Sequence, residues 1–405
     1  MTTIIDNENK KLNFSNEREQ SQACLNSAEH EKNQGRKVLN VPNLRFPEFQ
    51  GEWEKCKLSD LCTFFSGGTP SSSNKDFYGG NIAFIRSGEL HANSTELLIT
   101  QDGYDNSSAK MVEVGDLLLA MYGATSGDIA VSRIKGAINQ AILCIRTNQN
   151  KKFIESVWNK HVSKILRKYL QGGQGNLSAD IVKGISFSFP TLVEQERIAK
   201  LISLLDERIA TQNKIIDKLQ SLIKGISSKI FASIKGVEYK MGDIATITNG
   251  NSNVQDAIAE AKEGLYPFFD RSEDIKYLPT FLFDKEAIIY PGEGADFMPR
   301  YFKGKFALHQ RCYAIFDFNE IINAQFLYFY LKTKNSYFIR NAVGSTMPSL
   351  RLDTFQKLKV VIPSKNTQYS VSLCLSYIEQ KCNLENEILQ TLLEQKQFLL
   401  RQMFI

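Results

Sequence analysis

Arginines, glycines and short polar residues gather in the predicted loops of two separate stretches of the chain. Amide and guanidinium side chains at loop tips can hydrogen-bond the edges of nucleic-acid bases, while glycine, serine and threonine let the backbone approach phosphates. The same residue types also build ordinary turns and helix caps, so that simpler explanation stays open for each of them. The candidates in the first stretch are Ser66, Gly68, Thr69, Ser71, Arg86, Ser87, Tyr122, Thr125, Ser126, Gln140, Gln174 and Asn176. The candidates in the second stretch are Asn249, Asn251, Asn253, Arg271, Ser272, Arg300, Tyr301, His309, Gln310, Arg311, Ser345 and Arg351.

Three arginines are the strongest single candidates in these two sets. Arg86, Arg271 and Arg300 each lie beside a predicted turn, and an arginine in such a place can donate two hydrogen bonds to one guanine. If Arg300 reads a base, its replacement by alanine should relax recognition in one part of the target only. A phosphate contact would instead weaken binding to every sequence equally.

The signatures of common catalytic sites are absent from the sequence. A phosphate-binding loop of the GxxxxGK[ST] type is missing, since Gly304-Lys305 is followed by phenylalanine, and no Asn-Pro-Pro-aromatic motif of adenine methyltransferases occurs. The Glu260-Ala-Lys262 triplet resembles a nuclease fragment, but residues 256–264 have the pattern of a helix. Four scattered histidines and seven cysteines without a CxxC pair predict no metal site and reduced thiols. We therefore expect no catalysis and no cofactor in this chain alone.

The loops need a scaffold, and the most regular element of the chain is a predicted long helix over residues 194–231. Its apolar positions alternate steps of four and three, which is typical of a coiled-coil seam. The seam positions are Ile198, Ile202, Leu205, Ile209, Gln212, Ile216, Leu219, Ile223, Ile226 and Ile230. A helix of this length extends about 57 Å at about 1.5 Å per residue, and it needs a partner to bury its seam.

The partner is predicted within the same chain, because moving 173 residues along the sequence from each seam position gives a second seam. Its positions are Val371, Leu375, Ile378, Cys382, Glu385, Leu389, Leu392, Lys396, Leu399 and Met403. Glu385 and Lys396 are expected to weaken this second seam. Flanking residues recur at the same spacing, with Pro190 matching Pro363 and Gln195 matching Gln368. The sequence therefore predicts an internal duplication.

Two similar α+β domains are predicted around the two long helices. The expected order is a flexible polar arm over residues 1–40, a first domain over 41–190, a central helix over 191–234, a second domain over 235–363 and a C-terminal helix over 364–405. Periodicity predicts a buried strand at 116–121, a helix at 151–170 and a further helix at 325–340. If a pseudo-twofold axis relates the two halves, the long helices pack antiparallel.

Composition sets limits but does not by itself indicate nucleic acid. The 405 residues carry a net charge of +5 and no strongly basic segment, so charge for DNA binding must gather on one face or come from partners. Hydrophobic residues make up 42% of the chain, and no run approaches the roughly 20 apolar residues of a membrane span. The amino terminus lacks an apolar signal segment, which leads us to expect a cytoplasmic protein.

The order of several motifs resembles the specificity subunit of type I restriction–modification systems. PNLRFPEFQGEW and KLSDL come first, then the loop FSGGTPSS, GDLLLAMYGATSG, INQAI and the helix sequence LVEQERIAKLISLLDERI. The resemblance covers about residues 41–405. It implies two target recognition domains joined by two helices that form an antiparallel coiled coil.

The resemblance also implies partners and a division of labour. Such a subunit binds double-stranded DNA at a bipartite, asymmetric site and assembles with two modification (methyltransferase) subunits and with restriction (translocase/nuclease) subunits. Adenine-N6 methylation and cleavage would be performed by those partners, with S-adenosylmethionine, ATP and Mg²⁺ bound in them. The long helix would hold the two domains over half-sites about one DNA turn apart.

Two other functions stay open at this point. The chain could be an enzyme whose motif is not recognisable, or a coiled-coil adaptor without DNA readout. Methylation assays on the isolated chain would reveal the enzyme, and gel shifts with random duplex pools would separate a DNA reader from an adaptor.

Overall fold

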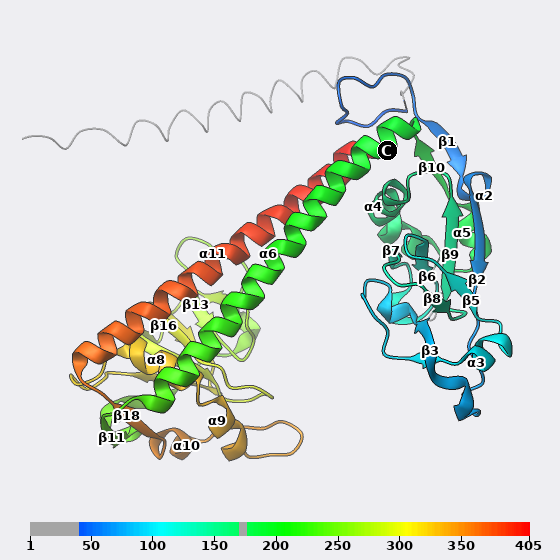
Figure 1. Ribbon diagram of the computed structural model, residues 1–405. Helices are drawn as coiled ribbons and strands as arrows, with labels where there is room; N and C mark the ends of the chain where they lie inside the picture. The colour runs from blue at the N-terminus through cyan, green and yellow to red at the C-terminus, as the bar shows by residue number, and fades with distance from the viewer. Residues whose placement is uncertain (1–39, 170–175) are drawn as a thin grey trace, which may run out of the picture. The chain divides into compact units, whose positions relative to one another are not determined.

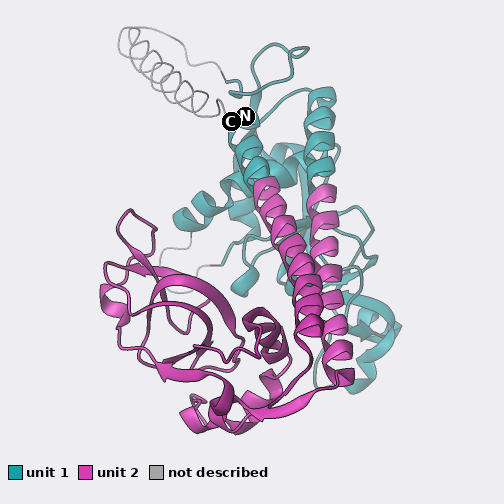
Figure 2. Cartoon of the chain, turned by 90° about the vertical axis from the view of Figure 1, so that its left-hand side faces the viewer, with its two compact units in different colours: residues 1–206, 394–405 teal, residues 207–393 magenta. Residues whose placement is uncertain are grey.

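The computed structural model describes residues 40–169 and 176–405. The candidate Gln174 and nearly all of the arm predicted at 1–40 lie outside these residues. The chain forms two compact units (Figure 2), unit 1 with residues 1–206 and 394–405 and unit 2 with residues 207–393. The predicted domain boundaries stay a prediction, because each unit takes part of both long helices. None of the described helices has a stretch long and apolar enough to cross a membrane.

Unit 1 is built on small sheets with one main helix against them (Figure 1). One four-stranded sheet has the order β2 (Cys62–Ser66), β9 (Ile142–Thr147), β6 (Leu117–Ala120) and β7 (Ile129–Val131). The other has the order β4 (Leu98–Ile99), β3 (Tyr78–Ile85), β8 (Gly136–Ile138) and β5 (Lys110–Val112). A two-stranded pair joins β1 (Glu54–Lys57) to β10 (Ser186–Phe189), and the helices are α2 (Leu58–Leu61), α3 (Gln101–Asp105), α4 (Lys151–Tyr169) and α5 (Ala179–Gly184).

Helix α4 confirms the helix predicted at 151–170. Its apolar residues recur about every four positions, so Phe153, Val157 and Ile165 share one face and are buried in the core of unit 1. The Asn150 side chain caps the helix by accepting a hydrogen bond from the Phe153 N–H at 3.0 Å. The strand predicted at 116–121 is also confirmed, as the fully buried β6.

Unit 2 has the same plan with a single larger sheet. Its six strands have the order β12 (Thr246–Asn249), β17 (Cys312–Phe316), β15 (Phe283–Pro291), β16 (Arg300–Leu308), β13 (Tyr266–Phe269) and β14 (Lys276–Leu278). A two-stranded pair joins β11 (Val237–Lys240) to β18 (Lys359–Ile362), and the helices are α7 (Met241–Ile244), α8 (Ala324–Lys332), α9 (Asn335–Asn341) and α10 (Leu352–Gln356).

Two predicted helices of unit 2 were wrong in part or in full. The helix expected at 325–340 is two helices, because the N–H and the hydroxyl of Thr333 both donate to the Tyr330 carbonyl and close the last turn of α8. The helix expected at 256–264 does not form. Ile258 instead exchanges two backbone hydrogen bonds with Tyr277 in β14, at 2.8 and 3.0 Å, which holds its backbone extended.

The two long helices, α6 (Leu192–Ser233) and α11 (Lys365–Met403), contribute to both units and run antiparallel in each. In unit 1 the start of α6 shares a core with the end of α11, where Ile198 and Met403 are buried. In unit 2 the end of α6 shares a core with the start of α11, where Ile230 and Leu375 pack. None of the twenty predicted seam residues is exposed. The antiparallel pair predicted from the heptads is therefore the observed arrangement.

Polar residues within the seam are paired with one another. The Gln212 amide donates to the Glu385 carbonyl at 2.9 Å and to the Glu385 carboxylate, and both residues are buried. Lys396 forms an ion pair with Asp206 at 2.6 Å. We expected Glu385 and Lys396 to weaken the seam, but each has a partner there that satisfies its polar group.

Two buried glutamines connect the start of each long helix to the main helix of a sheet domain. The Gln195 side chain accepts from the Asn150 N–H at 3.1 Å and donates to the Pro190 carbonyl at 2.9 Å. In unit 2 the equivalent contacts are made by Gln368, whose Oε1 accepts from the Asn323 N–H at 2.8 Å and whose Nε2 donates to the Pro363 carbonyl at 3.0 Å. The duplication read from the sequence thus extends to individual hydrogen bonds.

Candidate functional site

In unit 1 a glycine brings two of the candidate loops together. Gly67 follows β2, and a Cβ atom at this position would lie 1.8 Å from the Ile138 carbonyl oxygen, at the end of β8. Only glycine allows this approach. It places the loop after Ser66 against the turn that contains Gln140, where the Thr69 hydroxyl donates to the Gln140 side-chain oxygen at 2.6 Å.

Unit 2 repeats this arrangement around Gly250. A Cβ atom here would lie 2.0 Å from the Leu308 carbonyl oxygen, at the end of β16. The Ser252 N–H donates to the same Leu308 carbonyl at 3.1 Å, and the Gln310 N–H donates to the Ser252 carbonyl, also at 3.1 Å. Gly67 and Gly250 were not among the candidates, although both are glycines that directly follow a strand in equivalent parts of the two halves. Their recurrence beside matched strand ends was the signal that could have identified them.

Parallel strand pairing brings a third loop to the same end of each unit. In unit 1, Ile85 at the end of β3 pairs with Ile138, which places Arg86 and Ser87 beside the Gln140 turn. In unit 2, Phe269 at the end of β13 pairs with Leu308, so Arg271 and Ser272 follow there.

A fourth strand end completes the site in each unit. The Leu177 N–H donates to the Met121 carbonyl at 2.9 Å, just after β6, and the Leu350 N–H donates to the Gly292 carbonyl at 2.8 Å, just after β15. These bonds bring the remaining candidate loops to the same strand ends. The loops hold Tyr122, Thr125, Ser126 and Asn176 in unit 1, and Ser345 and Arg351 in unit 2.

Four candidates are strand residues instead of loop-tip residues: Ser66 and Asn249 end β2 and β12, and Arg300 and Tyr301 begin β16. Arg300 is the first residue of β16. Its Nη2 donates to the Ser272 carbonyl, its guanidinium lies 5.9 Å from the Phe269 ring centre, and its buried Nη1 has no hydrogen-bond partner among the described residues. The Tyr301 hydroxyl donates to Glu286 across the strand pair. The nine-residue strand, which the sequence did not predict, holds both side chains against the domain.

Arg86 is at the expected place, but two of its three guanidinium nitrogens already donate to carboxylates. Its Nε and Nη2 donate to Glu89 at 3.1 Å, and Nη2 also donates to Glu96 at 2.8 Å. These two carboxylates raise the pKa of Arg86 above its ordinary value. A guanine contact by Arg86 would therefore have to displace existing ion pairs.

Five of the unit 2 candidates line one open cavity of about 490 Å³, namely Arg271, Ser272, His309, Gln310 and Arg311. Asp270 also lines this cavity and is 5% exposed. Burial acts to raise the pKa of the Asp270 carboxyl, but hydrogen bonds from Lys276 and Ser272 outweigh burial and hold this pKa below its ordinary value. Burial lowers the pKa of His309. Near neutral pH the cavity is thus lined by a neutral imidazole, an amide, two arginines and Lys276, together with the carboxylates of Asp270 and Glu293.

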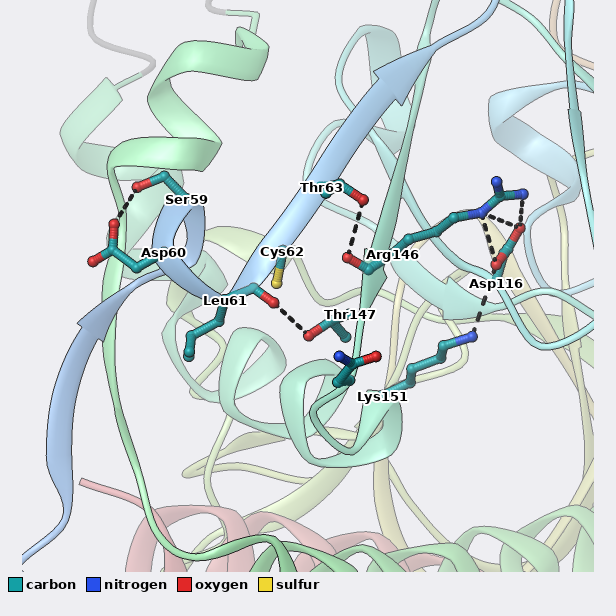
Figure 3. A pocket seen from close by; sticks show the side chains of 10 residues that line it. Ser59, Asp60, Leu61, Cys62, Thr63, Asp116, Arg146, Thr147 and Lys151 are labelled. Carbon is teal, nitrogen blue, oxygen red and sulfur yellow. Dashed lines mark hydrogen bonds and ion pairs between the residues drawn. The ribbon is translucent and has the colours of Figure 1, made fainter.

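A separate cavity in unit 1, of about 560 Å³, lies at the opposite end of β2 and β9 (Figure 3). Figure 3 shows Arg146 and Lys151 directed toward Asp116, with nitrogen–oxygen distances of 2.8 and 3.8 Å. The register of the two strands pairs Cys62 with Thr147 at this end, and Ser66 with Leu143 at the end that carries the candidate loops. This cavity is therefore distinct from the loop site, and its cations are already paired.

No group of three or more histidine, cysteine, aspartate or glutamate residues is arranged to hold a metal ion within residues 40–169 and 176–405. Six cysteines lie in this part of the chain, and each is a free thiol.

A family model described as the type I restriction modification DNA specificity domain matches the chain twice, at residues 50–221 and 235–394. Each match covers one sheet domain and part of a long helix. The two matches correspond to the two halves of the duplication.

Curated relatives have the same description. The chain is 30% identical over 132 residues to the type I restriction enzyme EcoDI specificity subunit of Escherichia coli, an alignment that covers 33% of this chain and 29% of the relative. It is 26% identical over 219 residues to the type I restriction enzyme MjaVIII specificity subunit of Methanocaldococcus jannaschii, covering 50% of this chain and 47% of the relative. The chain thus spans less than half the length of these two relatives.

Solved structures share the fold. The type I restriction-modification S subunit from M. genitalium aligns with a TM-score of 0.65 at 16% identity, covering 90% of this chain and 99% of that one. A chain from a study of complex assembly and conformational transition of the type I R-M system aligns with a TM-score of 0.51 at 14% identity, covering 86% and 96%. With both halves matched by the family model, the chain belongs to the family of type I restriction modification DNA specificity domains.

Proposed function

We propose that this chain is the sequence-specific DNA-recognition subunit of a type I restriction–modification complex, and that it reads a bipartite, asymmetric site in double-stranded DNA. The observation that carries this proposal is the repeated site. In each unit the same four strand ends converge around a close-packed glycine, while the side chains on those ends differ between the units. A common scaffold with different polar side chains suits two readers of different half-sites.

The chemistry would belong to partner subunits. We propose that two modification subunits methylate adenine at N6 with S-adenosylmethionine, and that restriction subunits use ATP and Mg²⁺ to move and cut DNA. This chain would bind no cofactor or metal and would catalyse no step itself. The complex would work in the cytoplasm, where it meets foreign DNA.

The pair of long helices would set the spacing between the half-sites. Helix α6 has 42 residues and α11 has 39, lengths of about 60 Å at about 1.5 Å per residue. Their seam is continuously covered and its polar positions are paired, which favours a stiff spacer. A coiled-coil adaptor without DNA readout is the less favoured function, because it would not need two matched loop sites.

The test is co-expression of the full chain with its modification subunits, followed by sequencing of methylated adenines in the host DNA. We expect one bipartite motif with unequal halves. Exchange of the loop at residues 249–253 for that of a relative should change one half and leave the other intact. Random methylation, or gel shifts of equal strength on every duplex with the modification subunits present, would refute the proposal.

A further inference from the structure

Arg311 in unit 2 has one side of its guanidinium held and the other side open. Its Nη1 donates to both carboxylate oxygens of Glu293, at 2.7 and 3.0 Å. Its Nε and Nη2 make no hydrogen bond to any residue in the described part of the chain. The Arg311 side chain is 63% exposed, whereas that of Glu293 is 17% exposed. The carboxylate is thus a half-buried support beneath an exposed pair of parallel donors.

The support is itself firmly placed. A Cβ atom on Gly292 would lie 1.8 Å from the Arg311 carbonyl oxygen, so the two backbones are in close contact. The Gly292 carbonyl accepts from Leu350, and Glu293 forms a backbone bridge with Ser349. Glu293 therefore projects from a backbone that is held on two sides. Holding one guanidinium nitrogen there reduces the freedom that Arg311 would lose when it binds a planar partner.

The two units differ in chemistry at the positions of Glu293 and Arg311. Pairing of Pro291 with Cys312 in unit 2 corresponds to pairing of Ala120 with Ile142 in unit 1. In unit 2, Glu293 follows Pro291 by two residues and Arg311 directly precedes Cys312. The equivalent residues in unit 1 are Tyr122, two residues after Ala120, and Ala141, directly before Ile142. The backbone is the same, but unit 1 has no charged pair here.

We propose that Arg311 reads a guanine in the half-site bound by unit 2, and that Glu293 is a positioning residue for this contact. The free Nε and Nη2 donors match the O6 and N7 acceptors that guanine presents in the major groove. The proposal rests on the DNA-recognition function proposed above and assigns one base contact within it. It also distinguishes Arg311 from Arg86, whose Nε and Nη2 already donate to carboxylates.

The test uses the complete complex with four variants of this chain: Arg311→Ala, Arg311→Lys, Glu293→Gln and, as control, Arg340→Ala. Arg340 is an exposed arginine of α9 in the same unit. The readout is the sequence context of methylated adenines, together with binding to duplexes that carry each base at every position of the motif.

Arg311→Ala should relax discrimination at one guanine of one half-site by roughly ten- to hundredfold and leave the other half-site unchanged. Arg311→Lys should relax the same position, because an ammonium cannot donate two parallel bonds, while retaining most of the affinity. Glu293→Gln should weaken discrimination at that position by a smaller factor. Arg340→Ala should preserve the wild-type base profile.

Equal loss of affinity on all duplexes with Arg311→Ala would overturn the base contact and mark a phosphate contact. A base profile of Glu293→Gln identical to that of the wild type would overturn the positioning role. If the wild-type complex itself shows no preferred sequence, the recognition function fails, which is distinguishable from failure of the Arg311 assignment.

Discussion

Removal of the two buried glutamines should loosen one unit at a time. Gln195 and Gln368 are 0% and 1% exposed, and their side chains fasten the N-termini of α4 and α8 to the long helices. Alanine at either position removes the bonds but leaves the helices able to form. We therefore expect Gln195→Ala to destabilise unit 1 and Gln368→Ala to destabilise unit 2.

The magnitudes follow from the backbone groups that lose a partner. Gln195→Ala frees two backbone groups, the Asn150 N–H and the Pro190 carbonyl. The Gln149 side chain also loses a bond, at 2.8 Å, but it is partly exposed and can turn to water. Gln368→Ala frees three groups, those of Asn323 and Pro363 and the Ile321 carbonyl. At about 1 kcal/mol for each partly or fully buried backbone group without a partner, the losses are about 2 and about 3 kcal/mol.

Hydrogen exchange measured by mass spectrometry on the full chain is the suitable assay, since a two-unit protein need not unfold in one step. A loss of about 1.4 kcal/mol raises the population of the open, exchanging state about tenfold. The first turns of α4 should therefore exchange about thirtyfold faster in Gln195→Ala, and those of α8 about a hundredfold faster in Gln368→Ala. The controls are Gln397→Ala on α11 and Gln220→Ala on α6, both exposed glutamines. Unchanged exchange in α4 or α8, or equal loosening of both helices in each variant, would refute the reasoning.

Three further outcomes are expected. Insertion of four residues at Ser221 lengthens α6 by about one turn, so sequencing of methylated adenines should show a changed spacer with the same half-site bases; changed bases would contradict the spacer role. Gly250→Ala forces a Cβ toward the Leu308 carbonyl and should abolish readout of one half-site in duplex-binding assays, whereas Gly225→Ala, with open space around it, should not. Burial lowers the pKa of His161, so protonation favours unfolding and stability should fall as pH drops below about 6.5. Thermal melts of His161→Phe should lose less between pH 7 and 5 than the wild type, and an equal loss would exclude His161 as the cause.

The elements predicted best from the sequence were those whose periodicity and burial agree. The long helices, the strand at 116–121 and helix α4 each bury a continuous face, so one local pattern determines both the element and its packing. The repeat of Gln195 at Gln368 could be read from spacing alone. The structural role of these two glutamines could not be read from the sequence, because their partners Asn150 and Asn323 are distant from them in sequence.

The sequence was least informative where long-range pairing decides the local structure. Residues 256–264 have a helical pattern, but the backbone of Ile258 pairs with Tyr277. Arg300 was predicted beside a turn and begins β16 directly after a loop, but long-range packing buries part of its guanidinium. The candidate loops did converge as a group, because Gly67 and Gly250 fix strand ends that no single stretch of sequence reveals. Which loop residues contact DNA stays a prediction.

The two repeats differ at the centre of the helix pair, where equivalent positions meet. Gln212 and Glu385 are equivalent positions, 173 residues apart, and they contact each other. Identical copies would place either two amides or two carboxylates at this buried contact, and two carboxylates would repel each other in a region with little water. With one of each, the amide donates to the carboxylate, and Lys381 at 2.5 Å from Glu385 supplies the opposite charge. Divergence between the repeats thus occurs inside the scaffold as well as at the loops, which makes the chain a covalent pair of unlike halves.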